Sequence, residues 1–131
     1  MRLPIAGLVI GVWALLPPYS GPEINTATRV EVADHVVPAA LLLGISLWAL
    51  LAARRPSSGS GSAMLVAGFG VVLAGLWMTA THLPLVAQAR RDQVTEAAAA
   101  YHTIPGLVVL ALGAIWAARH WSAAAPDRPT A

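Results

Sequence analysis

The sequence predicts an all-α protein, a bundle of four transmembrane helices built from two tandem two-helix repeats. Three observations support this fold class: four apolar runs, two halves that resemble each other, and a composition with 57% hydrophobic and only 11% charged residues. Soluble domains usually carry about 25% charged residues, so we expect this chain in a lipid bilayer. A bilayer is therefore the first expected partner.

The apolar runs cover residues 3–16, 36–53, 63–80 with an extension to 89, and 97–118. A helix needs about 20 residues to cross the hydrocarbon core, and the first run is short, ending at Pro17-Pro18. Its charged start and apolar middle are also typical of a signal peptide, but no small-x-small cleavage site follows. We expect a retained first helix, with Trp13 and Tyr19 as interfacial anchors.

A Ser/Gly-rich linker at residues 56–62 separates a first two-helix repeat at residues 1–55 from a second at residues 63–121. A disordered C-terminal tail is expected at residues 122–131. Two copies of a two-helix unit must be related by an axis along the membrane normal, which makes the second and fourth helices symmetry partners. The matching segments are Gly11-Val12-Trp13 with Gly75-Leu76-Trp77, and His35-Val36-Val37-Pro38 with His102-Thr103-Ile104-Pro105.

The placement of arginine predicts the orientation, because positively charged residues favour the cytoplasmic side. Both termini are expected in the cytoplasm, and only Arg90-Arg91 in the third loop argue against this. The arginines stand singly or in pairs beside apolar runs, not in a clustered basic face, so nucleic acid is not an expected partner. The arginines that support the orientation are Arg2, Arg54, Arg55 and Arg119.

The segment from Gly11 to Gly21 resembles the SPW-repeat membrane proteins, a bacterial group of two-helix units. In that group the first helix ends in a Trp followed by a Ser-Pro-Trp-like turn and a Gly. Pro17 stands where the group usually has Ser, and the second half keeps Trp77 and Pro84 without the spacing. The resemblance implies the two-repeat fold and a bacterial inner membrane, and it carries no activity.

Several classes of chemistry are excluded or unsupported by the residues. The chain has no cysteine, which excludes disulfides and thiolate metal sites. It shows no paired carboxylates within a span, no nucleophile elbow and no phosphate-binding loop, so no catalytic residues are expected. No Asp, Glu or Arg lies inside an apolar run, which argues against a transporter half with an intramembrane carboxylate.

Three of the four histidines are expected at the outer membrane face. Proline costs little in the first turn of a helix, so Pro38 and Pro105 are expected to mark the starts of the second and fourth helices. His35 and His102 then lie at those N-terminal ends, and His82 lies near the exit of the third helix.

This cluster allows two ligand-binding interpretations and one structural interpretation. His35 and His102 could hold haem b axially, or the three histidines with a carboxylate from Asp34, Glu31 or Glu96 could hold zinc or copper. The structural alternative is that these rings bond backbone or lipid headgroups and match through duplication alone. Haem meets a further objection, because a helix N-terminus disfavours a positive partner.

The remaining residue patterns predict packing and anchoring. Trp48, Trp116 and Trp121 are expected in an aromatic belt at the cytoplasmic interface, with Trp77 nearer the outer one. Small residues allow helices to approach closely, and those expected to do so are Gly7, Gly11, Gly68, Gly70 and Gly75. The expected function is a structural or accessory subunit of a homo-oligomer or larger membrane complex, without catalysis of its own; the alternative is the haem- or metal-binding protein.

Overall fold

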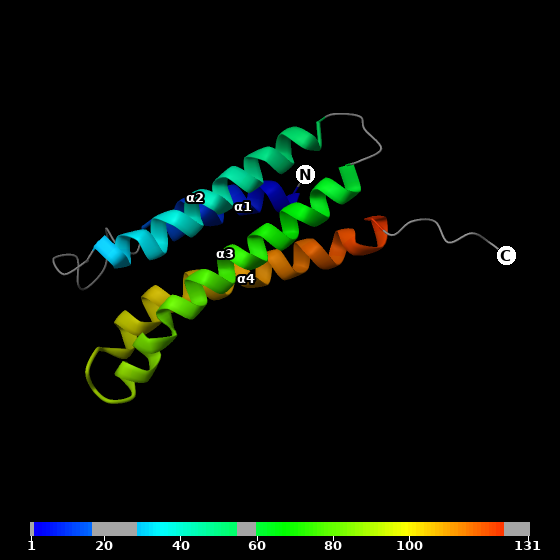
Figure 1. Ribbon diagram of the computed structural model, residues 1–131. Helices are drawn as coiled ribbons and strands as arrows, with labels where there is room; N and C mark the ends of the chain where they lie inside the picture. The colour runs from blue at the N-terminus through cyan, green and yellow to red at the C-terminus, as the bar shows by residue number, and fades with distance from the viewer. Residues whose placement is uncertain (1, 17–28, 55–59, 125–131) are drawn as a thin grey trace.

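Four helices form the part of the chain that the structure describes. The structure is a computed structural model that describes residues 2–16, 29–54 and 60–124. Within these residues the chain is all-helical, as the sequence predicts. The helices are α1 (Arg2–Ala14), α2 (Arg29–Ala52), α3 (Ser60–Ala89) and α4 (Glu96–Ala124), shown in Figure 1.

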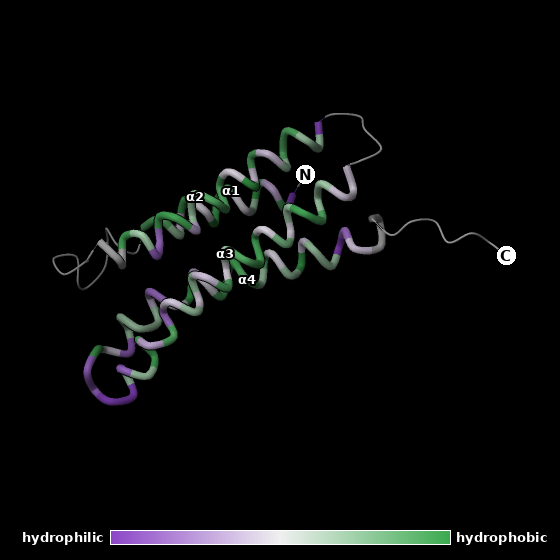
Figure 2. Tube along the Cα trace, viewed as in Figure 1, coloured by the Kyte–Doolittle hydropathy of each residue, from purple (hydrophilic) through white to green (hydrophobic). Residues whose placement is uncertain are grey.

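Three of these helices are long enough and apolar enough to cross a bilayer. Their candidate spans are Val32–Ala52, Ser60–Ala89 and Glu96–Trp121. The fourth, α1, is apolar but has 13 residues, about 20 Å at 1.5 Å per residue, against a hydrocarbon core of about 30 Å. The expected turn after α1, with Pro17 and Tyr19, lies outside the described residues. Figure 2 shows hydrophobic colour along the middle of the helices and hydrophilic colour at the α3–α4 turn.

Helices that follow each other in the chain run in opposite directions (Figure 1). The most extensive packing is between α3 and α4, while α2 packs against both α1 and α3 and α1 also contacts α4. The starts of α1 and α3 therefore lie at the same end of the bundle as the ends of α2 and α4.

Glycines let α3 and α4 approach until their backbones touch. A Cβ atom at Gly68 would lie 2.6 Å from the backbone nitrogen of Ala117, and one at Gly75 would meet the backbone of Leu110. On the other side, a Cβ at Gly7 of α1 would meet the side chain of Ser46 in α2. The predicted role of these small residues in close packing is confirmed.

The predicted starts of the second and fourth helices are wrong. Pro38 and Pro105 lie inside α2 and α4, each at the tenth residue of its helix. Proline removes only one backbone donor, and transmembrane helices tolerate this where neighbouring groups compensate. The start of α4 is capped instead by Thr95, whose Oγ1 accepts a hydrogen bond of 3.1 Å from the Ala98 backbone N–H.

Other boundaries also shift outwards. Residues 60–62, expected in the linker, form the first turn of α3, and residues 122–124, expected in the tail, belong to α4. The predicted extension of the third helix to residue 89 is confirmed. The helix then ends in a Schellman turn, in which Gln93 donates its backbone N–H to Gln88 and Asp92 donates to Ala89. Asp92 occupies the left-handed position of this turn, with φ of 57°.

The aromatic-belt prediction is wrong for Trp116. Its side chain is fully buried in the core between helices, where a Cβ at Gly7 would lie 3.5 Å from its ring. The glycine leaves the space that the indole fills, so this tryptophan packs the bundle and does not face lipid headgroups. Trp48, Trp77 and Trp121 are exposed on the described surface.

Candidate metal centre

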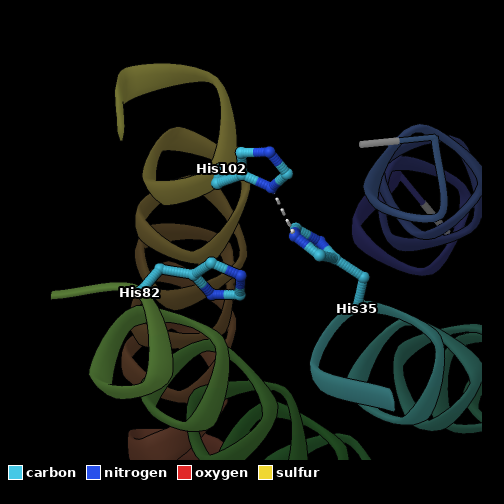
Figure 3. Close-up of side chains that lie close together, drawn as sticks. All are labelled: His35, His82 and His102. Carbon is cyan, nitrogen blue, oxygen red and sulfur yellow. Dashed lines mark hydrogen bonds between the residues drawn. The ribbon is translucent and has the colours of Figure 1, made fainter. Parts of the chain in front are cut away.

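Three histidines from three helices point toward one another, as Figure 3 shows. His35 comes from α2, His82 from α3 and His102 from α4. His35 is 0% exposed and His82 is 4% exposed, while His102 is half-buried. One ring nitrogen from each lies within 4.8 Å of the other two, so the predicted convergence of these side chains is confirmed.

A direct contact between ring nitrogens joins His35 and His102. Nε2 of His35 lies 3.1 Å from Nδ1 of His102, a hydrogen-bonding distance. One of these nitrogens must donate a proton and the other must accept it, because two lone pairs or two N–H groups facing each other would repel. The contact therefore places at least one ring lone pair inside the cluster.

His82 is held by its own helix. Its Nδ1 lies 2.7 Å from the backbone carbonyl oxygen of Met78, one turn earlier. A carbonyl can only accept, so Nδ1 carries the proton and Nε2 carries the lone pair. Histidines that bind metals commonly donate their second nitrogen to a carbonyl in this way, which fixes the ring and its tautomer.

The rings are packed at short range beyond these bonds. The centroids of His35 and His82 lie 4.4 Å apart, and the rings of His82 and His102 are stacked at 5.9 Å with an interplanar angle of 6°. The three side chains thus form a single compact group, which we call the histidine cluster.

His35 and His102 occupy equivalent places in their helices. Each is the seventh residue of its helix and stands three residues before a proline, Pro38 or Pro105. Neither histidine lies at a helix N-terminus, as the sequence had led us to expect, because both helices begin earlier. The helix-dipole objection to a positive partner is correspondingly weaker here, since that effect falls off within the first turn.

The expected carboxylate ligand is not part of the cluster. Asp34 points elsewhere, because its Oδ1 accepts a hydrogen bond of 3.5 Å from Nε1 of Trp77. Consecutive residues on a helix are turned by about 100°, so Asp34 and His35 cannot share one direction. Glu96 is exposed in the first turn of α4, and the side chain of Glu31 lies outside the described set. Among the described residues, the group contains histidines alone.

Three imidazoles without a carboxylate favour a transition metal such as zinc or copper over magnesium or calcium, which prefer oxygen ligands. Zinc–imidazole bonds are about 2.0–2.1 Å long, so two nitrogens on a tetrahedral ion lie about 3.3 Å apart. The 3.1 Å pair already matches this spacing. The ring of His82 would have to move closer to the other two, since the three ring nitrogens lie up to 4.8 Å apart.

Haem fits this arrangement less well than a single ion. Axial nitrogens on opposite sides of an iron would lie about 4 Å apart at bond lengths near 2 Å, with the porphyrin plane between them. The 3.1 Å contact between His35 and His102 leaves no room for that plane. The third imidazole, His82, packs against His35 and occupies space that the macrocycle would need.

Two features of the cluster were not predicted from the sequence. The carbonyl of Met78 orients His82, and Thr81 Oγ1 lies 3.1 Å from the same His82 nitrogen. A backbone carbonyl leaves no residue signature, although the helical spacing of four between Met78 and His82 is a signal that could have suggested the bond. The fourth histidine, His120, lies at the other end of α4 and donates from Nδ1 to the carbonyl of Trp116 at 3.0 Å.

Comparison of the chain with models of protein families, with curated proteins and with solved structures finds no match.

Proposed function

We propose that this chain is a small membrane protein that binds one zinc or copper ion through His35, His82 and His102. The observation that carries the proposal is the placement of three buried or half-buried ring nitrogens, from three different helices, within 4.8 Å of one another. A site with three protein ligands keeps a fourth position for water or another molecule.

The cost of burying these rings supports a ligand-binding role. Nδ1 of His35 is buried and makes no hydrogen bond of good geometry, although the backbone of Ala14 lies near enough to interact with the ring; a poorly paired buried group costs about 1–3 kcal/mol. A structural core position would be served better by leucine, which Leu42 illustrates two turns further along the same face of α2. A bound cation would offset part of the cost of burying three imidazoles, because it would bind one nitrogen of each ring. The proton that His35 and His102 share would then move to the second nitrogen of its own ring.

We extend this proposal to the membrane topology. In it, α1 is a fourth span and the two hairpins, α1 with α2 and α3 with α4, are tandem repeats. The equal positions of His35 and His102 in their helices support this proposal, and the resemblance to SPW-repeat proteins agrees with it. Cytoplasmic termini in a bacterial inner membrane, inferred from the arginines, would then put the histidine cluster near the outer face.

The test is a zinc and copper titration of the protein purified in mild detergent and freed of metal with a chelator. We expect one ion per chain. Replacement of His35, His82 or His102 by alanine removes a metal ligand. The affinity should fall by a larger factor than the about 10–100 that is typical when a residue hydrogen-bonded to a ligand is removed. His120→Ala is the matched control, because this histidine lies at the other end of the bundle, and it should leave the affinity unchanged.

Two results would contradict the metal-binding proposal. One is absence of binding by the unaltered protein. The other is an equal loss in His120→Ala and in the cluster variants, which would indicate non-specific coordination. A metal-free protein whose cluster variants still fold would return the function to an accessory subunit of a membrane complex, and identification of the proteins that co-purify with it would be the next step.

A further inference from the structure

A second polar site lies at the end of the bundle opposite the histidine cluster, where α1 begins and α4 ends. It is a cavity of about 410 Å³. Its lining residues are Arg2, Leu3, Pro4, Met64, Arg119 and His120. The polar residues among them are two arginines and a histidine, with no carboxylate. We call this cavity the arginine pocket.

The charges of the arginine pocket are not neutralised within the described residues. Arg2 and Arg119 come from different helices, are both exposed, and neither forms an ion pair with any described residue. His120 is half-buried, and its bond to the carbonyl of Trp116 holds the ring in a fixed direction. Two guanidinium groups that line one cavity and have no ion-pair partner among the described residues form a candidate anion site, and guanidinium groups bind phosphate oxygens in a bidentate geometry.

The depth of the pocket indicates where the anion comes from. The apolar span of α4 ends at Trp121, directly after His120, and Trp121 is 63% exposed. Exposed tryptophan at the end of a span is typical of the headgroup level of a bilayer. The apolar part of the lining, Leu3, Pro4 and Met64, would contact the glycerol and the first acyl carbons rather than a freely hydrated ion.

We propose that the arginine pocket binds the phosphate group of an anionic membrane lipid through Arg2 and Arg119. Basic pockets between transmembrane helices bind lipid headgroups in this way. The inference does not depend on the histidine cluster, since the two sites share no residue. Free inorganic phosphate offers the same chemistry, so the experiment has to separate the two sources.

The experiment is native mass spectrometry of the full chain in detergent with phosphatidylglycerol, compared with phosphatidylcholine of the same acyl chains. We expect phosphatidylglycerol to bind more tightly. Hydrogen bonds from guanidinium groups to phosphate oxygens are charge-assisted and stronger than neutral ones, so Arg2→Gln/Arg119→Gln should weaken phosphatidylglycerol binding about 30-fold, which corresponds to about 2 kcal/mol. Arg119→Gln alone should weaken it about fivefold.

The matched control is Arg54→Gln/Arg90→Gln, which removes the same charge from exposed positions outside the pocket. It should change the affinity by less than about twofold. Equal losses in the control and the pocket variant, or no preference for phosphatidylglycerol over phosphatidylcholine, would overturn the proposal. The melting temperature of each variant without lipid shows whether it is folded, and the single Arg119→Gln variant serves if the double variant is not.

A competition with inorganic phosphate identifies the source of the anion. If millimolar phosphate leaves phosphatidylglycerol bound, the lipid headgroup is the ligand. If phosphate displaces the lipid and binds the lipid-free protein with the same dependence on Arg2 and Arg119, the pocket still binds phosphate, but from solution.

Discussion

Nε2 of His35 and Nδ1 of His102 lie 3.1 Å apart, although 67 positions separate the two residues in the chain. They meet because each is the seventh residue of a helix that runs in the same direction through the bundle. The contact holds two nitrogens at about the spacing that a tetrahedral ion requires. If a metal bound here, two metal–nitrogen bonds would replace this hydrogen bond, and the shared proton would move to the second nitrogen of its own ring.

Replacing His35 with leucine separates a binding role from a structural one. We expect His35→Leu to abolish metal binding while changing the free energy of unfolding of the metal-free protein by no more than about 1 kcal/mol, because it removes the poorly paired Nδ1 together with the hydrogen bond to His102. Denaturant unfolding in detergent with a chelator measures this. Leu42→Ala on the same face should cost about 2–5 kcal/mol; a comparable loss in His35→Leu would mean that the imidazole is structural.

Gly68 tests the close contact between α3 and α4. In Gly68→Ala the added methyl group would lie 2.6 Å from the backbone nitrogen of Ala117, which cannot move without its helix, so we expect a loss of about 1–3 kcal/mol. Gly44→Ala is the control, because a Cβ there has nothing within 4 Å. It should be neutral or stabilise by up to about 1 kcal/mol. The two variants are compared by thermal unfolding, and equal effects would argue against this helix packing.

Replacing the two tryptophans of α4 by alanine should have very different effects on stability. Trp116 is 0% exposed, and Trp116→Ala should lower the free energy of unfolding by about 3–5 kcal/mol because it leaves a large cavity. Trp121 is 63% exposed, and Trp121→Ala should have little effect on unfolding in detergent. If the loss were larger at Trp121, the aromatic-belt interpretation of Trp116 would have to be restored.

The turn between α3 and α4 offers a stabilising substitution. Asp92 has φ of 57°, a conformation that costs an L-residue about 1–2 kcal/mol and glycine nothing, although Asp tolerates it better than most. Asp92→Gly should raise the melting temperature. The control is Arg91→Gly, one residue earlier, because Arg91 does not have a positive φ. This variant should have a lower or unchanged melting temperature. If Arg91→Gly raised the melting temperature more than Asp92→Gly, Asp92 would not be the left-handed residue of the turn.

The helices were predictable because long apolar runs have few alternatives in a chain this poor in charge. Their starts were not, since the preference of proline for the first turn misplaced the beginning of α2 and α4 relative to Pro38 and Pro105. A membrane helix continues through proline when neighbouring groups satisfy the backbone. Hydropathy alone also does not predict that polar residues such as 60–62 form the first turn of α3.

The proximity of His35, His82 and His102 was predictable from the sequence, but the set of residues that could bind a metal was not. The equivalent motifs around His35 and His102 predicted that these two residues lie together. The direction of the Asp34 side chain was harder to predict, because each residue turns a helix by about 100° and the start of α2 was predicted at the wrong residue. The burial of Trp116 could not be predicted either, because a helix that is apolar on all sides has no amphipathic pattern to indicate which face is buried.

The most direct test of the metal site is X-ray absorption at the zinc edge of the protein loaded with one equivalent of zinc. We expect nitrogen and oxygen ligands at about 2.0–2.1 Å, with the multiple-scattering signal of three imidazoles. This number should fall to two in each single cluster variant that still binds zinc. A shell with one imidazole or none, or a spectrum unchanged by replacement of His35, His82 or His102, would contradict the central claim.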